Sequence, residues 1–263
     1  MKRMRILNNP FGPTVELSKK AAFMNRFPLD VYKRKMSNNV LEVMMGYTNL
    51  DSLHKLGGYV KNRELLKYLN FNFQYLLPFE GKKHDYGSKR YKEIRRRIME
   101  FYFVNGTIGE RSLRRYAKYV SDQVIYPLLR QARLHSHTSC NHIYLYRFTH
   151  RGRFNAVWNT LPGNLNLSGA TAGDQICYQF RCKSFNSAYV TPEASAERHF
   201  IKKIARLLAN FVKHGAMNFK CMRELNVGKT LKMISVPEQR RMQFWDQLRN
   251  EFFIDDSGHR DEL

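Results

Sequence analysis

The sequence predicts an α/β fold in which a few sheet strands are separated by a large helical excursion. Two runs, residues 40–48 and 142–149, are apolar and rich in the residues that strands favour. Between them, residues 59–135 carry apolar side chains at intervals of three and four, which indicates helices. The resulting order of strand, helices, strand, loop, helix, strand and helix is typical of α/β architecture.

The first half of the chain is expected to contain one strand and three helices. Prolines and glycines interrupt the first 39 residues, so little regular structure is expected there. The apolar run Val40–Thr48 then predicts a largely buried strand that ends at a turn. Helices are expected near residues 60–77, 88–103 and 110–134, and Pro78 helps to separate the first two.

The second half begins with the strand at 142–149 and a long loop from Gly152 to about Asp174. Thr191 and Pro192 are suitable as the cap and first residue of a helix, and Gly215 suits its end. A short strand at 231–236 and a closing helix near 238–252 complete the expected order. The helix that is expected to start at Thr191 has an apolar stripe, which predicts core packing. Its members are Phe200, Ile204, Leu207, Leu208 and Phe211.

The net charge of +23, from 45 Lys and Arg against 22 Asp and Glu, favours a polyanionic partner such as nucleic acid or an acidic membrane. The charge is densest between Lys82 and Lys118. In that segment Ile94, Ile98 and Tyr102 recur at helical spacing, so the arginines are expected on the opposite, solvated face. Because no nucleic-acid-binding motif accompanies the charge, we expect no nucleic-acid partner. A basic polyanion-binding module remains an alternative.

The cysteines predict neither a metal site nor a cofactor, since their spacing fits no zinc pattern. Only Cys177 and Cys182 are close in sequence. The four cysteines are expected either to be buried as apolar residues or to form one local disulfide. The other two cysteines are Cys140 and Cys221. No apolar run reaches the ~18 residues of a membrane-spanning helix, so no transmembrane segment is expected.

The two ends of the chain predict different compartments. The first ten residues lack the apolar stretch of a signal peptide, which alone favours the cytoplasm. The last four, Arg260-Asp261-Glu262-Leu263, resemble the retrieval signal of the endoplasmic reticulum lumen. Two glycosylation sequons, at Asn105 and Asn166, agree with a secretory protein. We therefore expect a lumenal protein if a signal peptide lies upstream, and a cytoplasmic one otherwise.

Seven short stretches together resemble one protein family in their order along the chain. They are Phe11–Glu16, Asp30–Tyr32, Met44–Ser52, Asp122–His135, Tyr144–Phe148, Gly169–Asp174 and Phe244–Asp246. This order is similar to the C-terminal part of the carboxylesterase and cholinesterase family, which has the α/β-hydrolase fold. The resemblance implies that residues 1–263 are a partial hydrolase domain whose N-terminal half is absent.

The resemblance also implies an esterase with a triad of serine, acid and histidine, in that chain order. The acid position falls at Asp51, where the family usually has Glu, and Asp is able to orient a histidine in the same way. The histidine position falls at Ala172, which has no group that accepts a proton. The Gly-x-Ser-x-Gly motif of the nucleophile is absent, because Ser168 and Ser257 precede a glycine but lack the first one.

Three other histidines lie near these positions in sequence. His142 and His150 belong to the expected strand and its end, and His54 is expected to be a surface or packing residue. The leading hypothesis is a catalytically impaired, carboxylesterase-like protein that binds an unidentified protein or small molecule. The alternative within the enzyme class is an active carboxylic-ester hydrolase of which this chain is an incomplete part. The exposed sheet edge of such a part predicts poor solubility without a partner.

Overall fold

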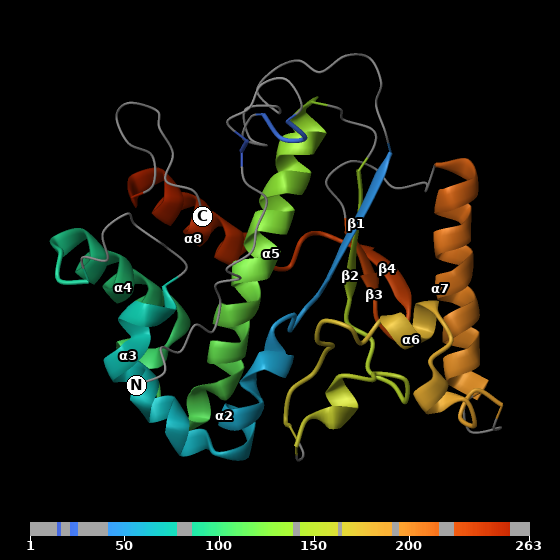
Figure 1. Ribbon diagram of the computed structural model, residues 1–263, viewed down its shortest axis with the longest axis horizontal. Coiled ribbons are helices and arrows are strands. Elements are labelled where there is room, and N and C mark those ends of the chain that lie inside the picture. The colour runs from blue at the N-terminus through green and yellow to red at the C-terminus, as the bar shows by residue number, and fades with distance from the viewer. Residues whose placement is uncertain are drawn as a thin grey trace.

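A four-stranded mixed sheet lies at the centre of the computed structural model (Figure 1). Its strands are β1 (Val43–Thr48), β2 (Ile143–Phe148), β3 (Glu224–Val227) and β4 (Leu231–Ile234), side by side in that order. The first three strands are parallel and β4 is antiparallel to β3. The structure describes residues 15–16, 22–25, 42–77, 86–138, 143–162, 165–190, 195–215 and 224–252.

Two layers of helices cover the two faces of this sheet (Figure 1). The long helix α5 (Leu113–Thr138) packs on one face, with α4 (Lys89–Tyr102) and α8 (Gln239–Phe252) beyond it. Helix α7 (Ser195–His214) covers the other face, next to the short helix α6 (Ile176–Gln179). The predicted α/β class is therefore confirmed, and so are the helices expected near 88–103, 110–134 and 238–252.

Helix α7 ends as the sequence predicts, while its expected start lies outside the described residues. Gly215 follows the helix with a φ of +61°, a conformation that glycine adopts at little cost. Thr191 and Pro192, the expected cap and first residue, are not among the residues that the structure describes.

The single helix expected at 60–77 is wrong, because the segment forms several short turns. It contains the end of α2 (Gly57–Lys61), α3 (Leu69–Asn72) and the 3-10 turns Arg63–Tyr68 and Phe73–Leu76. Asparagine side chains bond to the backbone here and compete with helical hydrogen bonds. Asn62 accepts from the backbone of Glu64, and Asn70 donates to the carbonyl of Lys67. The apolar spacing is retained, but a continuous helix is not.

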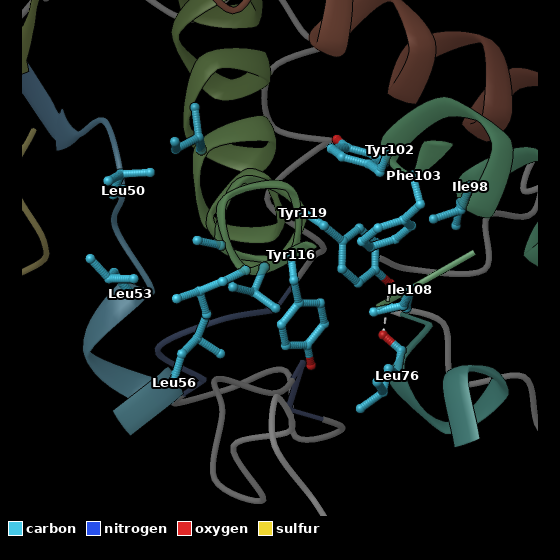
Figure 2. Packing of buried hydrophobic residues seen from close by; sticks show 14 of the residues in the cluster. Leu50, Leu53, Leu56, Leu76, Ile98, Tyr102, Phe103, Ile108, Tyr116 and Tyr119 are labelled. Atoms are coloured by element: carbon cyan, nitrogen blue, oxygen red, sulfur yellow. Dashed lines mark hydrogen bonds between the residues drawn. The ribbon is translucent and has the colours of Figure 1, made fainter. Parts of the chain in front are cut away.

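The larger of two apolar cores is built around α5 and is rich in aromatic rings. Tyr116 and Tyr119 of α5 are fully buried, and the hydroxyl of Tyr119 donates to the carbonyl of Leu76 at 2.8 Å (Figure 2). The hydroxyl of Tyr102 donates to Asp122 at 2.7 Å and accepts from the indole nitrogen of Trp245 at 2.7 Å. These bonds satisfy buried polar atoms while the rings supply apolar area.

The turn that follows β1 is anchored in the same core. Leu50, Leu53 and Leu56 point from this turn toward α5, and all three are buried (Figure 2). Because these leucines face inward, Asp51 is half-buried and His54 is exposed. Ser52 of the same turn is buried as well, and its backbone nitrogen donates to the hydroxyl of Ser121 at 3.1 Å.

The smaller core lies between the sheet and α7. Phe148 of β2, Val227 of β3 and Phe200 of α7 are buried there, and Phe154 of the long loop and Tyr178 of α6 join them. This core fixes the course of the loop that leads to residue 172. None of the helices in the described part of the chain is long and apolar enough to cross a membrane.

Candidate active site

The acid position and the histidine position of the resemblance lie side by side. β1 and β2 are parallel, so the chain leaves both at the same edge of the sheet. Asp51 comes three residues after β1, and the loop after β2 returns to it at Ala172. The backbone nitrogen of Ala172 donates to the carbonyl oxygen of Asp51 at 3.0 Å.

Two further contacts hold the loop Gly169–Asp174 against the acid turn. The backbone nitrogen of Leu50 donates to the carbonyl of Ala170 at 3.1 Å. The backbone nitrogen of Ala170 donates to the side-chain oxygen of Asn49 at 2.9 Å. The two segments are therefore joined through backbone atoms and the side chains of Asn49 and Thr171, and the side chain of residue 172 takes no part.

The loop owes its path to two glycines and one buried aspartate. Gly169 and Gly173 have φ values of +135° and +91°, which disfavour residues that carry a Cβ. The carboxylate of Asp174 is fully buried and accepts from the backbone nitrogens of Val157, Trp158 and Thr171 at 3.1, 2.8 and 2.8 Å. These three bonds tie the first part of the long loop to its last part.

The carboxylate of Asp51 is held by its own turn. It accepts from the hydroxyl of Thr48 at 2.9 Å and from the backbone nitrogen of Thr48 at 3.4 Å. The side chain is half-buried, so a carboxylate is available at the position where the family resemblance predicts the acid.

Ala172 provides no proton acceptor at the opposing position. Its side chain is a half-buried methyl group, whereas a triad needs an imidazole that takes the proton of the nucleophile. The two positions are adjacent in space, and they pair a carboxylate with a methyl group.

His54 is the residue near this site whose contacts sequence reasoning missed. Its Nδ1 lies 3.1 Å from the carbonyl oxygen of Asp51 and 3.2 Å from the hydroxyl oxygen of Thr171, and its backbone nitrogen donates to that hydroxyl. The hydroxyl of Thr171 itself donates to the carbonyl of Asp51, so Nδ1 must carry the proton in these contacts. This tautomer leaves Nε2 as an acceptor on an exposed ring.

The only advance signal for His54 was its position three residues after Asp51, which places it on the same turn. His150, in contrast, packs into the smaller core. Its ring stacks on Phe200 at 3.8 Å and meets Tyr178 edge-on at 5.1 Å between centroids. Burial lowers the pKa of its imidazole, so the neutral form is favoured. His142 lies outside the described residues.

A polar cluster lies nearby, where β1, β2 and β3 meet the start of α8. The hydroxyl of Tyr47 lies 2.8 Å from a carboxylate oxygen of both Glu224 and Glu238. Arg147 contacts Glu238 at 3.0 Å and is 4.0 Å from Glu224. Burial raises the pKa of Glu224 to about 7, and the repulsion of Glu238 acts in the same direction. Sequence patterning gave no sign of this cluster.

The structure describes some, but not all, of the other residues that the sequence analysis singled out, which are the cysteines, the sequons and the C-terminal tail. Cys177 and Cys182 form a disulfide, so the local bridge is the correct one of the two expectations for this pair. The sequon residues Asn105 and Asn166 are both exposed, as glycosylation requires. Cys140, Cys221 and the tail Arg260–Leu263 lie outside the described residues. Among the residues that the structure describes, no group of three His, Cys, Asp or Glu is arranged to hold a metal ion.

Comparisons with known proteins agree with this geometry. The model of the carboxylesterase family matches residues 3–252. Among solved structures, the chain is similar to juvenile hormone esterase from Manduca sexta, crystallised with OTFP covalently attached, with a TM-score of 0.66 and 18% identity. Aspergillus niger EstA matches with a TM-score of 0.44 and 12% identity over 80% of this chain and 40% of EstA. A search of curated proteins found no match.

The alignment with juvenile hormone esterase covers 91% of this chain and 47% of the esterase. The chain thus spans about half the length of that relative. The family match covers nearly all of the sequence, and the mixed sheet with its helices is the corresponding part of the hydrolase fold. The chain therefore belongs to the carboxylesterase family and has the architecture of a C-terminal portion of an α/β-hydrolase.

Proposed function

We propose that this chain belongs to a carboxylesterase-like protein that does not hydrolyse esters by the histidine-dependent mechanism and acts by binding. The observation that carries the proposal is Ala172, whose backbone bonds to Asp51 while its side chain offers no base. Removal of a triad base typically lowers the rate by several orders of magnitude. The ligand is a small molecule or a protein that recognises the esterase surface.

The disulfide and the exposed sequons support a secretory location for this protein. Disulfides persist in oxidising compartments such as the lumen of the endoplasmic reticulum. The tail Arg260–Leu263 has the form of a retrieval signal. Expressed behind a signal peptide, the chain should carry glycans that endoglycosidase H removes, and the N105Q/N166Q variant should carry none.

The proposal predicts the absence of ester turnover. The purified chain should hydrolyse p-nitrophenyl acetate no faster than a heat-denatured sample. OTFP should form no covalent adduct detectable by intact mass, because the Gly-x-Ser-x-Gly nucleophile motif is absent. A longer product of the same gene that contains this motif should also be inactive and should gain turnover in its A172H variant. Ordinary turnover by the unmodified protein contradicts the proposal.

His54 favours one second candidate, an active hydrolase in which a different histidine acts as the base. Its Nδ1 is oriented by the carbonyl of Asp51, and its free Nε2 lies on the exposed side of the same turn. In this case the longer product hydrolyses the ester, and His54→Ala abolishes turnover while Ala172→His is not required. The two variants measured in parallel distinguish the candidates.

A further inference from the structure

Helix α7 carries a row of cations along its outer face. Arg198, Lys202 and Arg206 follow one another at four-residue intervals, which places them on one side of the helix about 6 Å apart. Lys203 and Lys213 extend this face along the helix. All five side chains are exposed. We call these five residues the α7 cationic face; from the first to the last, it is about 22 Å long.

The opposite side of α7 is turned to the sheet, so the cationic face is directed to solvent. Phe200 and Ile204 are buried in the smaller core. Glu197, the single acidic residue of the helix, is half-buried, and its carboxylate accepts from the backbone nitrogen of Arg153 at 3.3 Å. The helix therefore directs its bulky residues Phe200 and Ile204 inward and its cations outward.

Two arginines of α4, in contrast to the cations of α7, have acidic partners. On α4, Arg96 pairs with Glu93 at 2.6 Å and with Glu100 at 2.7 Å, and Arg97 pairs with Glu251. In the described part of the chain, the five cations of α7 form no ion pair. Their positive charge is thus uncompensated within that part, although the segment between Lys82 and Lys118 is the denser one in sequence.

We propose that the α7 cationic face binds a linear sulfated polysaccharide. Three cations at four-residue intervals, with two more along the same helix, match a chain that carries anionic groups along its length. Since the row lies on a rigid helix, the backbone that carries the cations is already ordered before the polyanion binds. The proposal is independent of whether the protein hydrolyses esters.

A membrane surface fits this helix less well. Amphipathic helices that lie on membranes insert an apolar face with residues such as Trp, Phe or Leu. The apolar side of α7 is packed against the sheet, and the exposed neighbours of the cations include Ala205, Ala209 and Val212. This outer face has no bulky aromatic anchor.

Nucleic acid also fits less well, for two reasons. Proteins that bind single strands combine cations with aromatic rings on which bases stack. The two aromatic rings of α7 are directed inward, since Phe200 is buried and Phe211 meets Tyr144 at 5.5 Å between centroids. In addition, the disulfide Cys177–Cys182 favours an oxidising compartment, where sulfated polysaccharides are made and nucleic acids are rare.

The test measures binding of a fluorescent heparin oligosaccharide to the full chain, carried on an uncharged solubility tag, by anisotropy between 0.05 and 0.3 M NaCl. We expect binding that weakens steeply with salt. The R198E/K202E/R206E variant should lose on the order of 100-fold in affinity, at about fivefold per cation. The R198Q/K202Q/R206Q variant should lose less, and it serves if the charge reversal disturbs folding.

The matched control is R111E/R114E/R115E, which changes the net charge equally at three exposed residues near the start of α5. It should change the affinity by less than about threefold, because it lies away from the α7 cationic face. Equal losses in the two variants, or absent or salt-independent binding, overturn the proposal. Tighter binding to an oligonucleotide of equal charge, or to phosphatidylserine vesicles, overturns the choice of polysaccharide.

Discussion

At the scale of single residues, Asp174 determines the shape of the loop that carries position 172. Its fully buried carboxylate accepts three backbone N–H groups, from Val157, Trp158 and Thr171. Hydrogen bonds to a charged acceptor are stronger than neutral ones, and an unpaired buried donor costs its full desolvation energy. Asp51, by comparison, is half-buried and accepts only from Thr48 among the described residues.

Asp174→Ala should therefore lower the free energy of unfolding by about 3–5 kcal/mol, because three N–H groups lose their acceptor. Asp51→Ala should lower it by about 1 kcal/mol. Pulse proteolysis in urea of a soluble fusion protein measures both. Equal effects of the two substitutions contradict the role assigned to Asp174.

At the scale of secondary-structure elements, Glu224 joins β3 to its neighbours through a shared proton. Tyr47 has one hydroxyl hydrogen but two carboxylate oxygens at 2.8 Å, so it satisfies only one of them as a donor. Arg147 and Arg241 face Glu238 at 3.0 and 3.6 Å and compensate its negative charge. Glu224 is 4.0 Å from Arg147, and its second oxygen has no partner among the described residues. Burial raises the pKa of Glu224 to about 7, so its protonated form, which is able to donate to Tyr47, is favoured at acidic pH.

This arrangement predicts that the protein loses stability as the pH rises. The folded pKa of Glu224 is raised to about 7 from 4.5, so between these values the folded state binds more protons than the unfolded state. The contribution of Glu224 is fully present below pH 4.5 and is lost as the pH rises through 7. It amounts to about 3 kcal/mol. Other charged groups nearby, which include Asp122 and Lys118 of α5, also make the stability depend on pH. Their effect is the same in the wild type and in a Glu224 variant.

Glu224→Gln isolates this contribution, because an amide donates to Tyr47 but does not titrate. Urea unfolding by pulse proteolysis, repeated from pH 4.5 to 8, should give a wild-type stability that falls more steeply than that of the variant. Parallel pH profiles for the two proteins are incompatible with a protonated Glu224.

The elements that the sequence predicted well are those whose periodicity is strong and local. Ile94, Ile98 and Tyr102 are buried at the expected spacing on α4, and the strand at 142–149 is β2. β3 was missed because it has four residues and includes Glu224, which only the neighbouring strands and α8 make compatible with burial. The expected helix at 60–77 was wrong because apolar spacing does not register asparagine bonds to the backbone.

The candidate site was predictable only in part. The resemblance identified positions 51 and 172, which the structure brings together. The contacts of His54 depend on where the loop returns, about 120 residues later, and no local pattern encodes that. The four-residue spacing of Arg198, Lys202 and Arg206 is visible in the sequence, but which cations meet an acid is decided by tertiary packing.

At the scale of the whole molecule, β1 is an apolar strand at the border of the described sheet. Within the described residues it pairs with β2 alone, and much of its surface is only half-buried. An uncovered edge of this kind pairs readily with another chain. Juvenile hormone esterase, in which the matching region is 47% of the chain, has additional polypeptide beyond the aligned part.

We therefore expect the untagged chain to be poorly soluble without a partner. Size-exclusion chromatography with light scattering should show assemblies much larger than one chain of 31.2 kDa. A polar or charged substitution on the border strand, such as Met44→Lys, should raise the soluble fraction. A monomer that unfolds cooperatively would contradict this expectation.

The way in which the loop Gly169–Asp174 is held also determines what can replace Ala172. Its bonds to the turn after β1 come from backbone atoms, from Asn49 and from the hydroxyl of Thr171, so the loop depends on no side chain at position 172. A histidine introduced there should leave the course of the loop unchanged, and a change in ester turnover of such a variant therefore reports its chemistry rather than a rearranged backbone.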